Sequence, residues 1–144
     1  MISQPTYDDA NLILRLYEMR REDRMREARA WFTAQFRPKK WEELATLVTP
    51  GSAENASFRM VISYWDMAAS FVVSGVLNKE LFFQSGRELL LVFERLRPVL
   101  GGIRESYQDP SYLANLERVG LEFAAYMRAQ SPDAYNAFVK RIGG

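Results

Sequence analysis

The stretch SYWDMAASFVVSG, residues 63–75, decides the fold, because it completes a pattern that fits a helix covered on most of its surface. At about 100° per residue, the apolar side chains form one broad face. That face contains Phe58, Met60, Val61, Tyr64, Trp65, Met67, Ala68, Ala69, Phe71 and Val72. The polar residues Arg59, Ser63, Asp66, Ser70 and Ser74 recur every three or four positions and form a narrow stripe. The spacing predicts a central helix that Ser52 caps and Gly75 ends.

Start and stop signals on both sides of this helix predict five to six helices in one domain, residues 1–144. A long first helix is expected over about 7–35, with a Thr6–Asp9 capping box, and a compact bundle over about 38–142. Asn78, Asp109-Pro110 and Ser131-Pro132 are expected to start the later helices, and Pro98 to kink or end the helix that contains it. Because no segment alternates like a strand, the fold class is all-α.

Composition excludes several kinds of chemistry. The chain has no cysteine and no histidine, which excludes thiolate–imidazole zinc sites, cysteine or histidine nucleophiles and haem ligation through either residue. We predict no cofactor and no metal site. A net charge of +1 provides no overall attraction to nucleic acid, so no nucleic-acid partner is predicted.

The most charged segment is RREDRMREAR, residues 20–29, in which acids lie at helical spacing from the arginines. This neutralised pattern favours a solvated face over a partner-binding face or a phosphate contact. The chain also lacks a signal-like start and an uncharged apolar run of about 18 residues. We therefore expect a cytoplasmic location without a transmembrane segment, and peripheral membrane association stays open.

The first helix has apolar residues on two sides. Ala10, Leu14 and Tyr17 continue the main face, whereas Leu12, Leu16 and Met19 form a second stripe opposite it. A helix that is apolar on two sides needs two partners. The second stripe is predicted either to bind another copy of the chain or to pack against two of its own helices.

Two groups of polar residues are candidates for binding a ligand. The stripe of the central helix contributes Asp66, Arg59, Ser63 and Ser70, and the segment near the Gly101-Gly102 pair contributes Arg104 and Tyr107. Asp66 could line a polar groove, face solvent, or pair with an arginine for structural reasons. No residue is assigned a catalytic role, although Asp66 could act with a second acid. The acids available for that purpose are Glu88, Glu94, Glu117 and Glu122.

Three stretches carry a resemblance that covers most of the chain. They are RREDRMREARAWF (20–32), YWDMAASFVVSGVLNKELFF (64–83) and FERLRPVLGGIRESYQDPSYLANLE (93–117). Their order resembles a bacterial all-helical domain of unknown function, in which an Arg-rich helix precedes a compact bundle. The resemblance implies a glycine turn, a short helix starting at a cap such as Asn78, and a later arginine followed by an aromatic residue, here Arg104 and Tyr107. Many relatives look membrane-anchored, with a transmembrane helix before the charged helix, and no such anchor is expected from this sequence.

These observations favour a non-enzymatic helical interaction or regulatory module that self-associates, with a homo-oligomer or another protein as its partner. The alternative is a small-molecule-binding protein, or a carboxylate-dependent enzyme, with a polar groove around Asp66.

Overall fold

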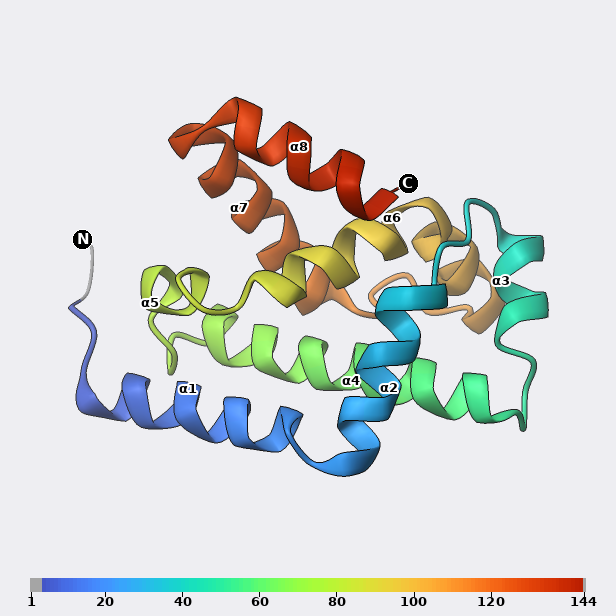
Figure 1. Cartoon of the computed structure of the whole chain (residues 1–144), viewed down its shortest axis with the longest axis horizontal. Coiled ribbons are helices and arrows are strands. Elements are labelled where there is room, and N and C mark those ends of the chain that lie inside the picture. The colour runs from blue at the N-terminus through green and yellow to red at the C-terminus, as the bar shows by residue number, and fades with distance from the viewer. Residues whose placement is uncertain (1–3, 144) are drawn as a thin grey trace.

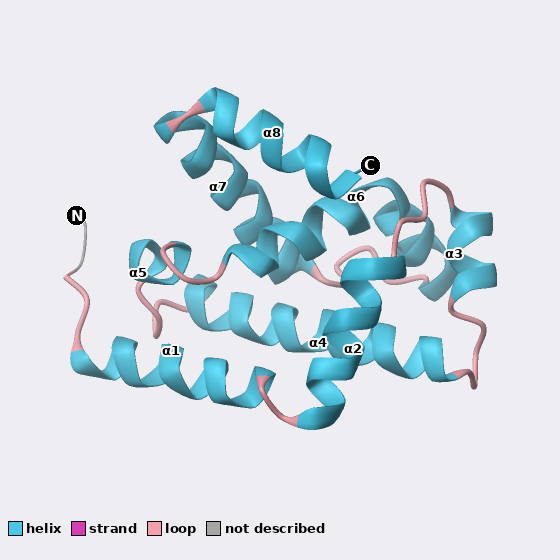
Figure 2. Ribbon diagram, viewed as in Figure 1, coloured by secondary structure: helices cyan, strands magenta, loops and turns pink. Residues whose placement is uncertain are grey.

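The computed structural model describes residues 4–143, in which eight helices are joined by short loops (Figures 1 and 2). They are α1 (Tyr7–Arg20), α2 (Asp23–Gln35), α3 (Trp41–Leu47), α4 (Ala53–Val73), α5 (Lys79–Phe83), α6 (Arg87–Tyr107), α7 (Ala114–Gln130) and α8 (Pro132–Gly143). These residues contain no strand, which confirms the all-α class. None of the eight helices is long and apolar enough to cross a membrane.

The central helix is α4, which packs most extensively against α7 and α2. The centre of its predicted apolar face lies in the core, whereas Met60 at one side of that face is exposed. The buried residues of the face include Phe58, Val61, Trp65, Ala68, Ala69 and Val72. Figure 1 shows α4 crossing the middle of the molecule, with α1 along one side of it and α6, α7 and α8 on the other. Ser52 caps α4 as predicted, by accepting a hydrogen bond from the Asn55 N–H.

The predicted long first helix is wrong, because the chain breaks at Arg21-Glu22 into α1 and α2. The Glu22 carboxylate caps α2 by accepting from the Met25 N–H at 3.1 Å. No continuous apolar face runs through residues 20–24 to hold one straight helix. The break also reverses the expected packing of α1: Leu16 is buried, whereas Leu14 is exposed.

A second break explains why there are eight helices rather than five to six. The chain turns at Gln84–Gly86, and Gly86 becomes the N-cap of α6. A Cβ at Gly86 would lie 2.6 Å from Phe82 Cζ, so only glycine lets this turn approach the ring. Pro98, in contrast, does not end α6, which continues through Gly101-Gly102 to Tyr107. Proline removes one backbone donor, and the buried side chains on both sides of Pro98 hold the helix together.

Two glycines that both lie inside helices provide a test of this packing. A Cβ at Gly120 would overlap the buried ring of Phe93, whereas a Cβ at Gly101 meets nothing within 4 Å. We expect Gly120→Ala to lower the free energy of unfolding by about 1–3 kcal/mol through overpacking. Gly101→Ala should raise it by about 0.5–1 kcal/mol, because alanine favours the helix. Urea unfolding of both variants measures the difference, and equal effects would contradict the predicted overlap.

Candidate functional site

Asp66 joins the central helix to the start of α7. Its Oδ1 accepts a hydrogen bond from the Leu116 N–H at 2.9 Å. The N-cap residue of α7, Leu113, has a φ of 59° and offers no side-chain cap. Asp66 therefore supplies, from another helix, the acceptor that the first turn of α7 needs. This use of the carboxylate is structural, and a ligand-binding role for Asp66 stays a prediction.

The serines of the Asp66 stripe bind their own helix. Ser63 Oγ donates to the Met60 carbonyl at 3.3 Å, and Ser70 Oγ donates to the Met67 carbonyl at 2.6 Å. Arg59 is exposed on the same side of α4. The serine hydroxyls are thus used locally, as is common for serine inside a helix.

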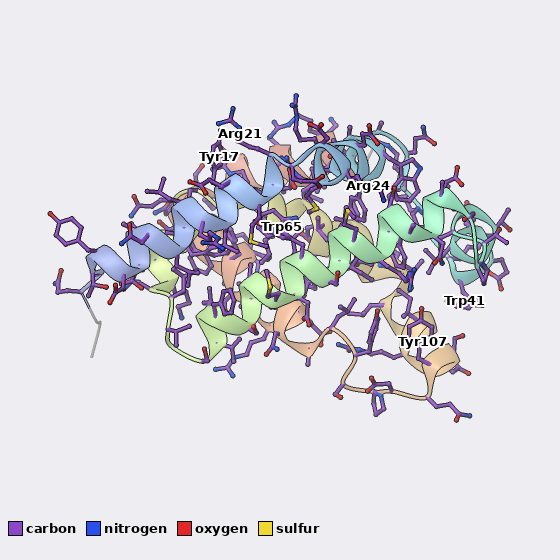
Figure 3. The ribbon with its side chains drawn as sticks, turned by 90° about the horizontal axis from the view of Figure 1, so that it is seen from below. Tyr17, Arg21, Arg24, Trp41, Trp65 and Tyr107 are labelled. Carbon is purple, nitrogen blue, oxygen red and sulfur yellow. The ribbon has the colours of Figure 1, made fainter. Side chains whose placement is uncertain are left out.

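The loop between α6 and α7 brings several predicted residues together. Arg104 donates from Nε to the Tyr112 carbonyl at 2.9 Å and from Nη2 to Glu117 Oε1 at 3.0 Å. The ring of Tyr107, labelled in Figure 3, meets the ring of Tyr112 edge-on, with centroids 5.0 Å apart. This loop contains two non-glycine residues with positive φ, Gln108 and Leu113, so its backbone is strained at both ends.

The phenol of Tyr112 marks where the two predicted groups meet. Burial raises the pKa of Tyr112, the nearby Tyr107 and Asp66 raise it further, and the charge of Arg59 lowers it. Four of the six predicted ligand residues, Asp66, Arg59, Arg104 and Tyr107, therefore lie near one half-buried tyrosine. Among residues 4–143, the side chains of Ser63 and Ser70 make only the hydrogen bonds within α4 described above.

The predicted interface residues have different environments. Leu16 is buried, and the Tyr64 hydroxyl donates to its carbonyl oxygen. Burial raises the pKa of Tyr64 to about 12, which keeps this hydroxyl a donor. Leu12 packs partly buried against the core, and Met19 is exposed. Of the two readings left open by the sequence, packing against the chain's own helices describes Leu16, and the interface role of Met19 stays a prediction.

Met19 lines a surface groove that the sequence did not predict. Met19, Met25, Met60 and Met67 line an open groove of about 530 Å³ between the α1–α2 corner and α4, together with Tyr64. Four of the six methionines in the chain meet there. We call this the methionine groove. Because its residues come from three helices, no pattern within one helix predicts it.

The sequence missed the buried Arg95, and for Asp9 it predicted the capping box with Thr6 but not the contact with α5. Asp9 accepts from the Asn78 N–H at 2.8 Å and from the Thr6 N–H at 2.7 Å, so one carboxylate serves the starts of α1 and α5. Arg95 donates to carbonyl oxygens of α2, the segment after it, and α8. A signal for Arg95 was present in the sequence, because it lies three residues after Val92 and four before Val99, which are both buried.

The acids considered as catalytic partners of Asp66 are each held by a basic residue. Glu88 binds Arg29 through both oxygens, at 2.8 and 2.9 Å, and also accepts from Trp65 Nε1. The remaining pairs are Glu94 with Arg97, Glu117 with Arg104, and Glu122 with Lys79 and Arg118. Within residues 4–143, no group of three or more acidic side chains is arranged to hold a metal ion. The pairing of each of these four acids with a basic residue is typical of structural ion pairs.

A family model described as "Domain of unknown function (DUF4760)" matches residues 5–123. The chain belongs to the DUF4760 family. The part of the chain that matches DUF4760 runs from the start of α1 into α7 and includes Asp9, Asp66 and Arg95. The DUF4760 match ends before α8. Comparison with curated proteins and with solved structures gave no match.

Replacing Asp66 tests its role as a remote cap. Asp66→Ala should lower the free energy of unfolding by about 0.5–2 kcal/mol, because the first turn of α7 loses its side-chain acceptor. The amide of Leu116 should also exchange with solvent faster, as measured by NMR. Ser63→Ala, on the exposed side of the same helix, should change stability by less than about 0.5 kcal/mol. Equal stability of the two variants, with Leu116 still protected, would rule out the cap.

Acid sensitivity tests the carboxylate of Asp9. The N–H groups of Asn78 and Thr6 hold the pKa of Asp9 below its ordinary value of 3.8. The stabilisation is therefore complete above pH 3.8 and is lost as the pH falls through the lowered pKa of the folded state. Asp9→Asn should be less stable at neutral pH and should lose less stability than the wild type on acidification. Urea unfolding across this pH range is the measurement, and an equal loss in both proteins would contradict the role of Asp9.

Proposed function

We propose that the chain is a non-enzymatic interaction module that self-associates through the outer face of α1. The observation that carries this proposal is a solvent-facing apolar stripe on that helix. Tyr7, Leu14 and Tyr17 are 90%, 59% and 49% exposed. With Ala10 they recur at steps of three and four residues, the spacing of a helix–helix seam.

We call the stripe of Tyr7, Ala10, Leu14 and Tyr17 the α1 seam. The position of α1 at the edge of the molecule supports a role for this seam in dimerisation (Figure 1). The opposite side of α1 carries buried Asp9 and Leu16 and faces the protein's own core. Figure 3 shows Tyr17 and Arg21 projecting from α1 on the side away from α4. The guanidinium of Arg21 lies 5.7 Å from the centroid of the Tyr17 ring. The outer face is thus apolar along its length and cationic at its C-terminal end.

A second copy of the chain fits this face, because two α1 helices packed antiparallel present complementary residues to each other. In an antiparallel pair centred on Leu14, the large Tyr17 lies opposite the small Ala10 of the other copy. Arg21 then lies opposite Tyr7, where a cation–π contact is favourable. A parallel pair would instead bring Arg21 against Arg21. The antiparallel pair has the two-fold symmetry of most homodimers.

The size of the seam predicts a weak and reversible dimer. A helix of 14 residues, such as α1, is about 21 Å long. Two such helices bury less than the roughly 1,200 Å² at which standard interfaces begin. We therefore expect dissociation in the micromolar range or above.

Sedimentation equilibrium over a range of protein concentrations tests the seam. The wild type should pass from monomer to dimer, and Leu14→Glu should stay monomeric, because the pair would bring two carboxylates together at its centre. Leu121→Glu is the matched control, because Leu121 is an exposed leucine of α7 (48%, against 59% for Leu14), and it should dimerise like the wild type. Leu16 is unsuitable for this test because it is buried.

Two results would contradict the seam. One is a wild type that stays monomeric at millimolar concentration. The other is a dimer that survives Leu14→Glu and is lost in Met60→Glu, which would place the contact in the methionine groove. Circular dichroism of each variant verifies that the monomer is folded.

A further inference from the structure

A basic pocket lies where the segment after α2 meets α6 and α8. Its volume is about 290 Å³, and its lining includes Arg37, Lys39, Arg95 and Arg97. Glu94 is the acid in that lining, and it is engaged on both oxygens: Arg97 pairs with Oε1 at 3.0 Å, and the Tyr135 hydroxyl donates to Oε2. The other three cations have no acidic partner among residues 4–143.

Arg95 is the deepest of these cations, with 6% of its surface exposed. Its Nε donates to the Ile142 carbonyl at 2.9 Å, and its Nη1 donates to three carbonyls at the end of α2, the closest being Thr33 at 2.7 Å. Within residues 4–143, Nη2 makes no hydrogen bond. Burial lowers the pKa of Arg95 to about 10, and the charge of Arg37 contributes to this. The guanidinium is therefore charged at neutral pH and lacks a full counter-charge.

Arg37 and Lys39 add positive charge at the mouth of the pocket. Arg37 Nη1 donates to the Ile142 carbonyl at 3.0 Å, and Lys39 Nζ donates to the Gly143 carbonyl at 3.1 Å. Each side chain is exposed and makes one bond to a neutral acceptor, which leaves further donors on both. An anion in the pocket would receive charged hydrogen bonds from these donors.

We propose that this pocket binds a small anion, a carboxylate or phosphate group attached to a compact apolar body. The three cations that have no acidic partner among residues 4–143 recognise the charged group, since guanidinium and ammonium donors both bind carboxylate and phosphate oxygens. Pro38, Pro98 and Val139 provide an apolar wall for the remainder of the ligand. The volume is close to the lower end of ligand pockets, about 300 Å³, which favours a small molecule. This site is independent of the α1 seam.

NMR titration of the full chain tests the pocket, with inorganic phosphate and butyrate as separate probes. We expect saturable shifts of the Lys39, Tyr135 and Val139 amides with at least one probe. Shifts with phosphate alone identify a phosphate ligand, and shifts with butyrate identify a carboxylate ligand. Either result supports the proposal.

Lys39 is the residue chosen for substitution, because Arg95 is buried and hydrogen-bonded to α2 and α8, so its removal would also destabilise the fold. Lys39→Glu should weaken binding by about tenfold or more, the loss expected when a charged hydrogen bond is removed. Lys40→Glu is the matched control, because Lys40 is the next residue, is also exposed, and lies outside the pocket lining. Its affinity should stay within a factor of about two of the wild type.

Two outcomes would overturn the proposal. One is the absence of shifts in the pocket amides with both probes up to their highest usable concentration. The other is an equal loss of affinity in Lys39→Glu and Lys40→Glu, which would indicate attraction to a basic surface rather than binding in a site.

Discussion

Backbone carbonyl oxygens near the C-terminal ends of α2 and α8 accept hydrogen bonds from the guanidinium of Arg95, which lies in the middle of α6. A buried cation normally requires an acid, because leaving a charge unpaired costs several kcal/mol. Here the partners are carbonyl oxygens at helix ends, which carry a partial negative charge. These bonds fix α2 and α8 relative to α6. The same arrangement leaves a basic pocket, because the carbonyls satisfy the hydrogen bonds of Arg95 without neutralising its charge.

At helix N-termini the charges are reversed: carboxylates accept hydrogen bonds from backbone N–H groups. Asp66 accepts from the first turn of α7, and Asp9 accepts from the start of α5 and from the segment before α1. In both cases a carboxylate on one helix satisfies backbone donors of another, where the positive end of the helix dipole favours it. Polar side chains thus join helix ends, while apolar side chains pack the faces between them. Asp66, the one acid in the central helix between Ala56 and Val73, has this structural task.

The sequence predicted some elements well and others poorly, for identifiable reasons. Thr6, Ser52, Asn78 and Ser131 each cap a helix as predicted, because a cap bonds to a backbone group two or three residues away. The breaks at Arg21-Glu22 and Gln84–Gly86 were missed, because the turn depends on what each half packs against. The loop of Arg104, Tyr107 and Tyr112 lies near Asp66 and Arg59 of α4, and spacing within either segment could not predict that the two segments come together.

The sequence by itself determined the all-α class, the caps and the buried face of α4, since each follows from residues three or four positions apart on one helix. It also excluded chemistry that needs cysteine or histidine. Only the tertiary structure decided that Leu16 is buried and Leu14 exposed, that Asp66 serves Leu116 from 50 residues away, and that Arg95 faces two helix ends. The reason is physical: burial and pairing depend on neighbours in space, and no local spacing specifies which distant backbone group reaches a side chain.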